Sequence, residues 1–263
     1  MITSNLFNPT DSHKVVDGKG RFSVIEYERD MSVSASNAQA AYFASKMNVR
    51  KRQVIAHTTE EDGIIVQAGA MQMMLGQVNV STNVKSAGDF FKKFAGSKVT
   101  GETTIKPYYI GEGTVVLEPT YKYIILEDLS EWQDAMVIED GMFLACEDTV
   151  EVSVKARDSM SSAIMGGEGL FNTTLSGSGI VVMESIVPAD ELIVIDMEDD
   201  ELKLDGNFAI AWSYGIKFTV ERTTKTLIGS AVSKEGFVNV YRGTGRVLVA
   251  PVQKDIKINN KQK

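Results

Sequence analysis

One pattern occurs three times along the chain, as Gly111-Glu112-Gly113-Thr114-Val115-Val116-Leu117, Gly177-Ser178-Gly179-Ile180-Val181-Val182-Met183 and Gly243-Thr244-Gly245-Arg246-Val247-Leu248-Val249. The spacing between successive copies is 66 residues both times. With 22 glycines in the chain, a lone Gly-x-Gly carries little weight. The equal spacing of the three copies, and the aliphatic residues that recur at the same positions after each, indicate an internal repeat. The middle residue differs in each copy, so the glycines are interpreted as structural turn residues and not as a phosphate-binding loop.

Turn signals fall at almost the same period outside this pattern. Asp140-Gly141 and Asp205-Gly206 lie 65 residues apart, and each opens a run rich in apolar residues. Asp-Gly before such a run is typical of a tight turn followed by a strand. We therefore predict a β-hairpin in each repeat, with the turns at Gly111, Gly113, Gly177, Gly179, Gly243 and Gly245.

The predicted fold is all-β, an internally repeated sandwich or barrel, because glycine turns are frequent and only 5 prolines occur. Short helices are predicted within residues 37–47, 86–95, 158–165 and 223–233. Three regions follow: an N-terminal strand with a possible helical insertion (1–52), the repeated β domain (53–253) and a polar tail (254–263). Repeated β units leave unpaired strand edges, so we expect a homo-oligomer.

Composition narrows the range of partners. The net charge of −8 repels nucleic-acid backbones and anionic lipid surfaces. The basic run Arg50-Lys51-Arg52 is interpreted as solvated surface. The polar start of the chain lacks the apolar run of a signal peptide, and no apolar stretch is long enough to span a bilayer. A single cysteine, Cys146, suits a reducing compartment, so a cytoplasmic protein is expected.

The sequence resembles the altered inheritance of mitochondria protein 24 family, as a bacterial member. The residues that carry this resemblance are Gly69-Ala70-Met71 with Met73 and Gly76, Phe90-Phe91-Lys92-Lys93, Gly166-Gly167-Glu168-Gly169-Leu170-Phe171 and the Gly-x-Gly strands. The resemblance covers roughly residues 63–251. It implies a double-stranded β-helix similar to that of the tryptophan RNA-binding attenuation protein, with internal duplication and an oligomer such as a trimer. It supplies no catalytic residues to carry over.

No residues form a recognisable catalytic or metal-binding signature. The two histidines, His13 and His57, lie 44 residues apart, so we expect no metal site and no cofactor. Cys146 alternates with core positions and is interpreted as an inert buried thiol. The acidic run Glu198-Asp199-Asp200-Glu201 lacks the spacing of a calcium loop and is interpreted as a solvated hairpin end. An activity based on carboxylates alone, for example Asp205 with a neighbour, stays open.

Methionines gather at one place, where Met71, Met73 and Met74 precede Leu75. In a regular strand Met71 and Met73 share one face and Met74 the other. Core packing is the favoured interpretation, but the flexible thioether also suits a partner-binding edge or a subunit interface.

The sequence is therefore compatible with two functional hypotheses. The first is a non-enzymatic structural or protein-interaction scaffold, because no catalytic constellation is present. The second is a small-ligand-binding module with sites at repeat or subunit interfaces, where glycine turns let backbone donors approach a ligand. RNA binding is a weaker third hypothesis, since the acidic balance opposes it.

Overall fold

The computed structural model describes residues 2–81, 106–156, 171–222 and 237–252. Their regular structure is mostly β-strand in three antiparallel sheets, with one α-helix and three short 3-10 helices. The all-β prediction is confirmed. The helices predicted within 86–95, 158–165 and 223–233, and the tail 254–263, lie outside the described residues.

The chain begins with the hairpin of β1 (His13–Lys19) and β2 (Phe22–Tyr27), followed by α1 (Ala38–Lys46). The predicted helix within 37–47 is present as α1. It ends before Asn48, whose positive φ of 62° is a common way to stop a helix. Ala41 and Ala44 are half-buried, but no residue of α1 is fully buried. The hairpin pairs with β3 (Lys51–Thr58) through β2. The N-terminal region is therefore part of the sheet that contains β3, which we call the first sheet.

The remaining strands form three units, which we define by residues 51–117, 123–185 and 193–249. Unit 1 contains β3, β4 (Ile64–Val66), β5 (Met71–Gly76), β6 (Asn79–Ser81), β7 (Tyr108–Ile110) and β8 (Gly113–Leu117). Unit 2 contains β9 (Tyr123–Asp128), η2 (Leu129–Trp132), β10 (Ala135–Ile138), β11 (Phe143–Glu147), β12 (Val150–Ala156), β13 (Phe171–Gly177) and β14 (Ile180–Ser185). Unit 3 contains β15 (Ile193–Leu204), β16 (Ala209–Ser213), β17 (Lys217–Arg222) and β18 (Phe237–Val249).

The three units share one pattern of strand pairing. In unit 1, β8 lies between β3 and β5, while β7 lies between β6 and β4. In unit 2, β14 lies between β9 and β11, while β13 lies between β12 and β10. In unit 3 the two halves of β18 and of β15 take these places, because both strands bend in the middle. Among the residues that the structure describes, each unit thus consists of two layers of three strands, counting each half of β15 and of β18 as one.

The Gly-x-Gly segments lie where the chain crosses from one layer to the other. β7 and β8 do not pair with each other, nor do β13 and β14, and the third segment lies inside the continuous strand β18. The predicted hairpins at these glycines are therefore wrong, and the segments are corners. Positive φ values occur at Gly111, Gly177, Gly179, Gly243 and Gly245, whereas Gly113 begins β8 without one.

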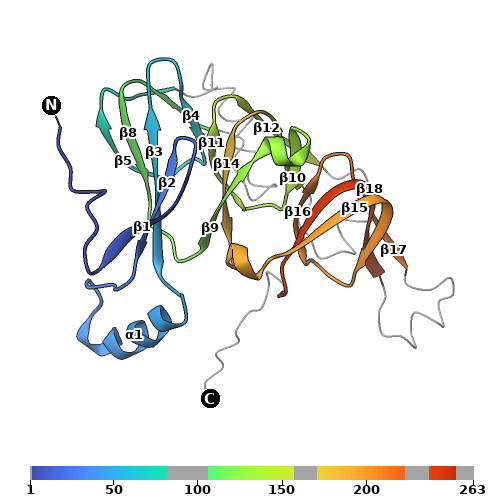
Figure 1. The fold of residues 1–263 in the computed structure, drawn as a ribbon, viewed down its shortest axis with the longest axis horizontal. Coiled ribbons are helices and arrows are strands. Elements are labelled where there is room, and N and C mark those ends of the chain that lie inside the picture. Colours follow the sequence, from blue (N-terminus) through green and yellow to red (C-terminus); the bar gives the residue numbers. More distant parts are fainter. Residues whose placement is uncertain (1, 82–105, 157–170, 223–236, 253–263) are drawn as a thin grey trace.

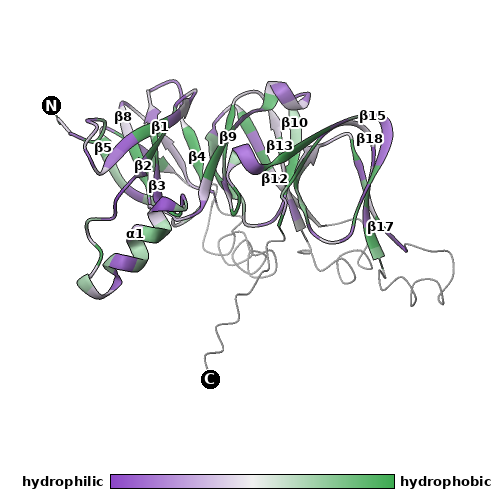
Figure 2. Ribbon diagram, turned by 60° about the horizontal axis from the view of Figure 1, so that its bottom comes forward, coloured by the Kyte–Doolittle hydropathy of each residue, from purple (hydrophilic) through white to green (hydrophobic). Residues whose placement is uncertain are grey.

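Neighbouring units are joined edge to edge. β4 of unit 1 pairs with β11 of unit 2, and β10 of unit 2 pairs with β16 of unit 3. We call these two junctions seams. Both views in Figures 1 and 2 place the units in a row along the long axis, with β5 near one end and β17 at the other.

The core runs continuously through the seams. Leu126, Ala145 and Val182 of unit 2 pack into the core of unit 1, and Ala211 and Leu248 of unit 3 pack into the core of unit 2. On the outer face of the first sheet, a small cluster of Ile25, Ile55 and Val116 is covered by Leu6 and Tyr27. The described residues thus form stacked layers that share their apolar faces. The division at residue 52 stays a prediction.

Candidate functional site

The methionine strand β5 lies at a free edge of the first sheet. It pairs with β8 on one side, and among the described residues no strand pairs with its other side. Met73 is 37% exposed and Met74 38%, whereas Met71 packs against the core of unit 1. Core packing, the favoured interpretation, is therefore wrong for Met73 and Met74. Their role as an interface stays a prediction.

A β-bulge changes which methionines share a face. Met71 pairs with Leu117 and Met73 with Val116, which are adjacent residues, so Gln72 is an extra residue in β5. Because cross-strand partners point to the same side, Met71 and Met73 lie on opposite faces. The expected shared face of Met71 and Met73 is wrong for this reason.

A second free edge, which the sequence did not single out, lies at the far end of the row. The second half of β15 pairs with β18, and in the described part of the chain its other side is unpaired. Leu202 and Leu204 are half-buried there and Lys203 is exposed. The acidic run Glu198-Asp199-Asp200-Glu201 lies at the bend of β15, opposite Gly243 and Gly245, and not at a hairpin end.

A third exposed apolar surface is formed by side chains of α1 and of Met47, the residue that follows it. Tyr42 is 57% exposed, Phe43 59% and Met47 76%. The helix is anchored from its inner side, where the Ser45 hydroxyl donates to the carbonyl oxygen of Glu28 and Arg50 Nε donates to the carbonyl oxygen of Ser45 at 2.9 Å. The aromatic side chains of α1 are therefore displayed on a fixed support.

Beside this helix, the basic run Arg50-Lys51-Arg52 forms part of a half-buried ion-pair cluster. Glu26, 7% exposed, accepts from Arg50 at 2.6 Å and pairs with Arg52 at 2.7 Å. Arg52 is itself 4% exposed and lies over the ring of Tyr123 at 4.3 Å. The expected solvated surface is thus wrong for Arg52, because its partner Glu26 lies on the neighbouring strand.

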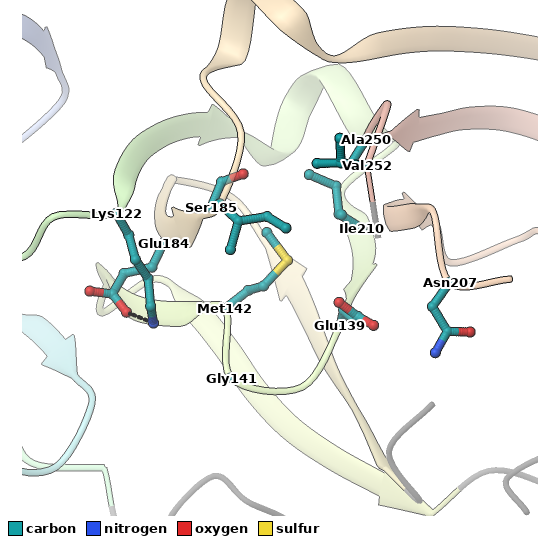
Figure 3. A pocket seen from close by; sticks show the side chains of 11 residues that line it. Lys122, Glu139, Gly141, Met142, Glu184, Ser185, Asn207, Ile210, Ala250 and Val252 are labelled. Atoms are coloured by element: carbon teal, nitrogen blue, oxygen red, sulfur yellow. Dashed lines mark hydrogen bonds and ion pairs between the residues drawn. The ribbon is translucent and has the colours of Figure 1, made fainter. Parts of the chain in front are cut away.

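A small pocket lies between units 2 and 3 (Figure 3). Met142, Ile210 and Val252 give it an apolar lining, and the ion pair of Lys122 and Glu184 stands at one side. Its free volume is about 30 Å³. This holds one or two water molecules, whereas pockets for metabolites have about 300 to 1,000 Å³.

A larger cleft of about 670 Å³ lies between α1 and the end of the N-terminal hairpin. Its lining combines charged side chains, among them Glu28, Asp30 and Arg50, with apolar ones such as Met31 and Val33. The volume is in the range of a metabolite site. It does not lie at a junction of units, which is where ligand sites are predicted from the sequence.

The candidate catalytic side chains lie apart from one another. His57 is exposed, hydrogen-bonds Thr114 at 3.2 Å and stacks on Phe7, while His13 hydrogen-bonds Thr10 at 2.9 Å. Cys146 is fully buried, and burial raises the pKa of its thiol. Asp205 is exposed in the turn before β16. The structure thus brings none of these described residues together.

One buried carboxyl group has a perturbed pKa. Burial raises the pKa of Glu127 above its ordinary value, against the hydrogen bond that Trp132 Nε1 donates to it at 3.0 Å. Trp132 is fully buried in η2. Trp132 belongs to the apolar core of unit 2, so this hydrogen bond holds the Glu127 carboxyl group against that core.

Within the described ranges, no group of three or more His, Cys, Asp or Glu side chains could hold a metal ion. No helix in this part of the chain is long and apolar enough to cross a membrane.

Comparison with known proteins identifies the family. The sequence pattern of the family described as mitochondrial biogenesis AIM24 matches residues 46–252. An uncharacterised protein of Streptococcus pyogenes serotype M6 is 25% identical over 194 residues, which make up 71% of this chain and 75% of that protein. A crystal structure of a Streptococcus pyogenes protein shares the fold, with a TM-score of 0.56, 22% identity and coverage of 79% of this chain and 90% of that one. Because the family pattern spans most of the chain, this protein belongs to the mitochondrial biogenesis AIM24 family.

Proposed function

We propose that this protein is a non-enzymatic, cytoplasmic β scaffold that contacts other proteins. In this proposal the three units are copies of one internal repeat, and the repeat builds a rigid row instead of an active site. The scaffold presents surfaces that other chains bind.

The exposed apolar side of α1 carries the proposal. Tyr42 and Phe43 expose more than half of their surface, next to each other on a helix inserted between β2 and β3. Aromatic residues and methionine are enriched at the centres of protein interfaces, and contiguous exposed apolar patches mark interaction sites. The support beneath the helix keeps this patch in place before binding, which lowers the entropy lost on association.

A pull-down from the native cell tests the scaffold function. We compare the wild-type chain with Tyr42→Ser/Phe43→Ser, and use Ile193→Ser/Val194→Ser as matched control, since Ile193 and Val194 are 50% and 53% exposed at a distant place. Proteins retained by the wild type and the control but lost by the α1 variant support the proposal. A wild-type chain that returns only itself contradicts it. Circular dichroism of all three chains checks that the variants fold.

A small-ligand-binding module is the second candidate, favoured by the 670 Å³ cleft beside α1. Its mixed lining suits a metabolite with both charged and apolar parts. A thermal-shift screen of amino acids, nucleotides and other metabolites tests this, because a ligand at 100 times its Kd stabilises by about 2.7 kcal/mol. Arg50→Gln should abolish a shift that depends on this cleft, and a screen without any shift contradicts the ligand function.

A further inference from the structure

The two seams follow the same residue-by-residue register. At the first, Val66, Ile65 and Ile64 lie opposite Ala145, Cys146 and Glu147. At the second, Ile138, Val137 and Met136 lie opposite Ala211, Trp212 and Ser213. The register of antiparallel strands is strongly specified where one face of the sheet is buried. The same register is therefore used at both junctions between units.

Counting from the first glycine of each corner identifies equivalent residues in the three units. The residue two places before the first glycine of each corner, namely Tyr109, Leu175 or Tyr241, pairs with Ile64, Met136 or Leu202. The segment of unit 3 equivalent to β4 and β10 is therefore the end of β15, with Leu202, Lys203 and Leu204. This is the edge that no described strand covers.

The same comparison identifies the counterpart in unit 1. The residue five places after the first glycine, namely Val116, Val182 or Leu248, pairs with Met73, Ala145 or Ala211. The strands β5, β11 and β16 also carry their bulge at the same place, before these three residues. β5 is therefore the unit 1 equivalent of the strands that accept a neighbour at the seams.

We propose that the end of β15 of one copy pairs with β5 of a second copy, as a third seam formed between chains. The register of the two internal seams then places Leu204 opposite Met73, Lys203 opposite Met74 and Leu202 opposite Leu75. This deepens the proposed scaffold function by naming its partner at these edges as the same chain. The proposal rests on the scaffold function in one respect: both treat the row of three units as the body that binds other chains.

The geometry requires two chains. β5 and unit 3 lie at opposite ends of the row in both views, so one chain does not close on itself (Figures 1 and 2). The two edges differ, which makes the contact heterologous, and such contacts give rings or open filaments. The outer face beside β5 is already covered by Leu6 and Tyr27, so the contact offered to a neighbour is the edge of the sheet.

Disulfide cross-linking tests the register. The only native cysteine, Cys146, is buried and does not interfere. We expect Met73→Cys/Leu204→Cys to form a ladder of covalent oligomers on a non-reducing gel after mild oxidation. Met74→Cys/Leu204→Cys is the matched control, because a slip of one residue turns the two side chains to opposite faces, and no ladder is expected.

Single variants separate this arrangement from a symmetric one. Met73→Cys alone should stay monomeric on the same gel. A covalent dimer of that single variant means that β5 pairs with β5, which overturns the proposal. A double variant that cross-links no more than the two single variants also overturns it.

Sedimentation velocity provides a second test without cysteines. Met73→Lys places a charge on the edge and should shift the assembly to the monomer, whereas Val80→Lys, on the exposed edge strand β6, should not. A wild-type chain that is a monomer at high micromolar concentration overturns the proposal. Partner capture by α1 is unaffected by these variants, so failure of this inference and failure of the scaffold function are distinguishable.

Discussion

In the described part of the chain, unit 2 pairs with a neighbouring unit on both sides, whereas units 1 and 3 each pair with one. At the position that faces the preceding unit, Ala145 and Ala211 are fully buried, while the equivalent Met73 of unit 1 is 37% exposed. The next position shows the same contrast, with Cys146 at 0% and Trp212 at 3% against Met74 at 38%. One backbone arrangement thus serves as a closed seam twice and as an open edge once, and the difference lies in what covers it.

The largest expected effect is a difference in unfolding free energy between a substitution at a seam and one at the free edge. Trp212 contacts the rings of Phe218 and Tyr241 at 6.0 and 5.4 Å and lies opposite Val137 of unit 2. Trp212→Ala should lower the free energy of unfolding by about 3 to 5 kcal/mol, because it leaves a large cavity. Met74→Ala, at the equivalent position, should change it by less than about 1 kcal/mol in dilute protein. Urea unfolding of both variants measures the contrast, and equal losses would contradict it.

A smaller effect is expected at the corners. A Cβ at Gly111 would clash with the carbonyl oxygen of Gln77, at Gly177 it would lie 2.6 Å from that of Thr149, and at Gly243 it would lie 3.4 Å from that of Gly215. All three have positive φ, so alanine brings strain of about 1 to 3 kcal/mol at each. The loss of stability should therefore decrease from Gly111→Ala through Gly177→Ala to Gly243→Ala.

Thermal unfolding of the three alanine variants ranks these losses. Gly215→Ala is the matched control, since Gly215 has no positive φ and its nearest neighbour would lie 3.9 Å away. A control that loses as much stability as Gly111→Ala would show that the corner geometry is not the cause.

The smallest effect concerns a polar residue that only unit 2 carries. Glu127 pairs with Val181, and the equivalent residues are Ala56 and Ile195. Because burial raises its pKa, the folded chain binds more protons than the unfolded chain above the ordinary pKa of 4.5. Its contribution to stability is therefore fully present below that pH and decreases as the pH rises through the raised value.

Glu127→Gln should remove this decrease and keep an acceptor for Trp132 Nε1. We expect a change of less than about 1 kcal/mol at neutral pH, with stability falling less between pH 4.5 and 7 than in the wild type. Unfolding midpoints of both chains across this range measure the difference. A steeper fall in the variant would contradict the assignment.

The three Gly-x-Gly segments could be recognised as places where the chain turns, because a positive φ such as that of Gly111, Gly177 or Gly243 favours glycine. The pattern did not separate a corner from a hairpin, since both use the same backbone conformation and only the partner strands differ. The face of Met73 was not predictable, because the bulge at Gln72 leaves no mark in the sequence. The burial of Arg52 depends on Glu26 of another strand, which is distant in the sequence. The strand edge at Leu202 and Leu204 was not predicted, because the acidic run directly before it indicated a solvated hairpin end.

The order of strands within a unit has a consequence for synthesis. In each unit the first strand pairs with the last: β3 with β8, β9 with β14, and the start of β15 with the end of β18. A nascent chain cannot complete a unit until its final strand has left the ribosome, and such distant pairings form slowly. Unit 1 can nevertheless close first and present β4 as a template for the emerging β11. We therefore expect the chain to assemble from its N-terminus, each finished unit guiding the next.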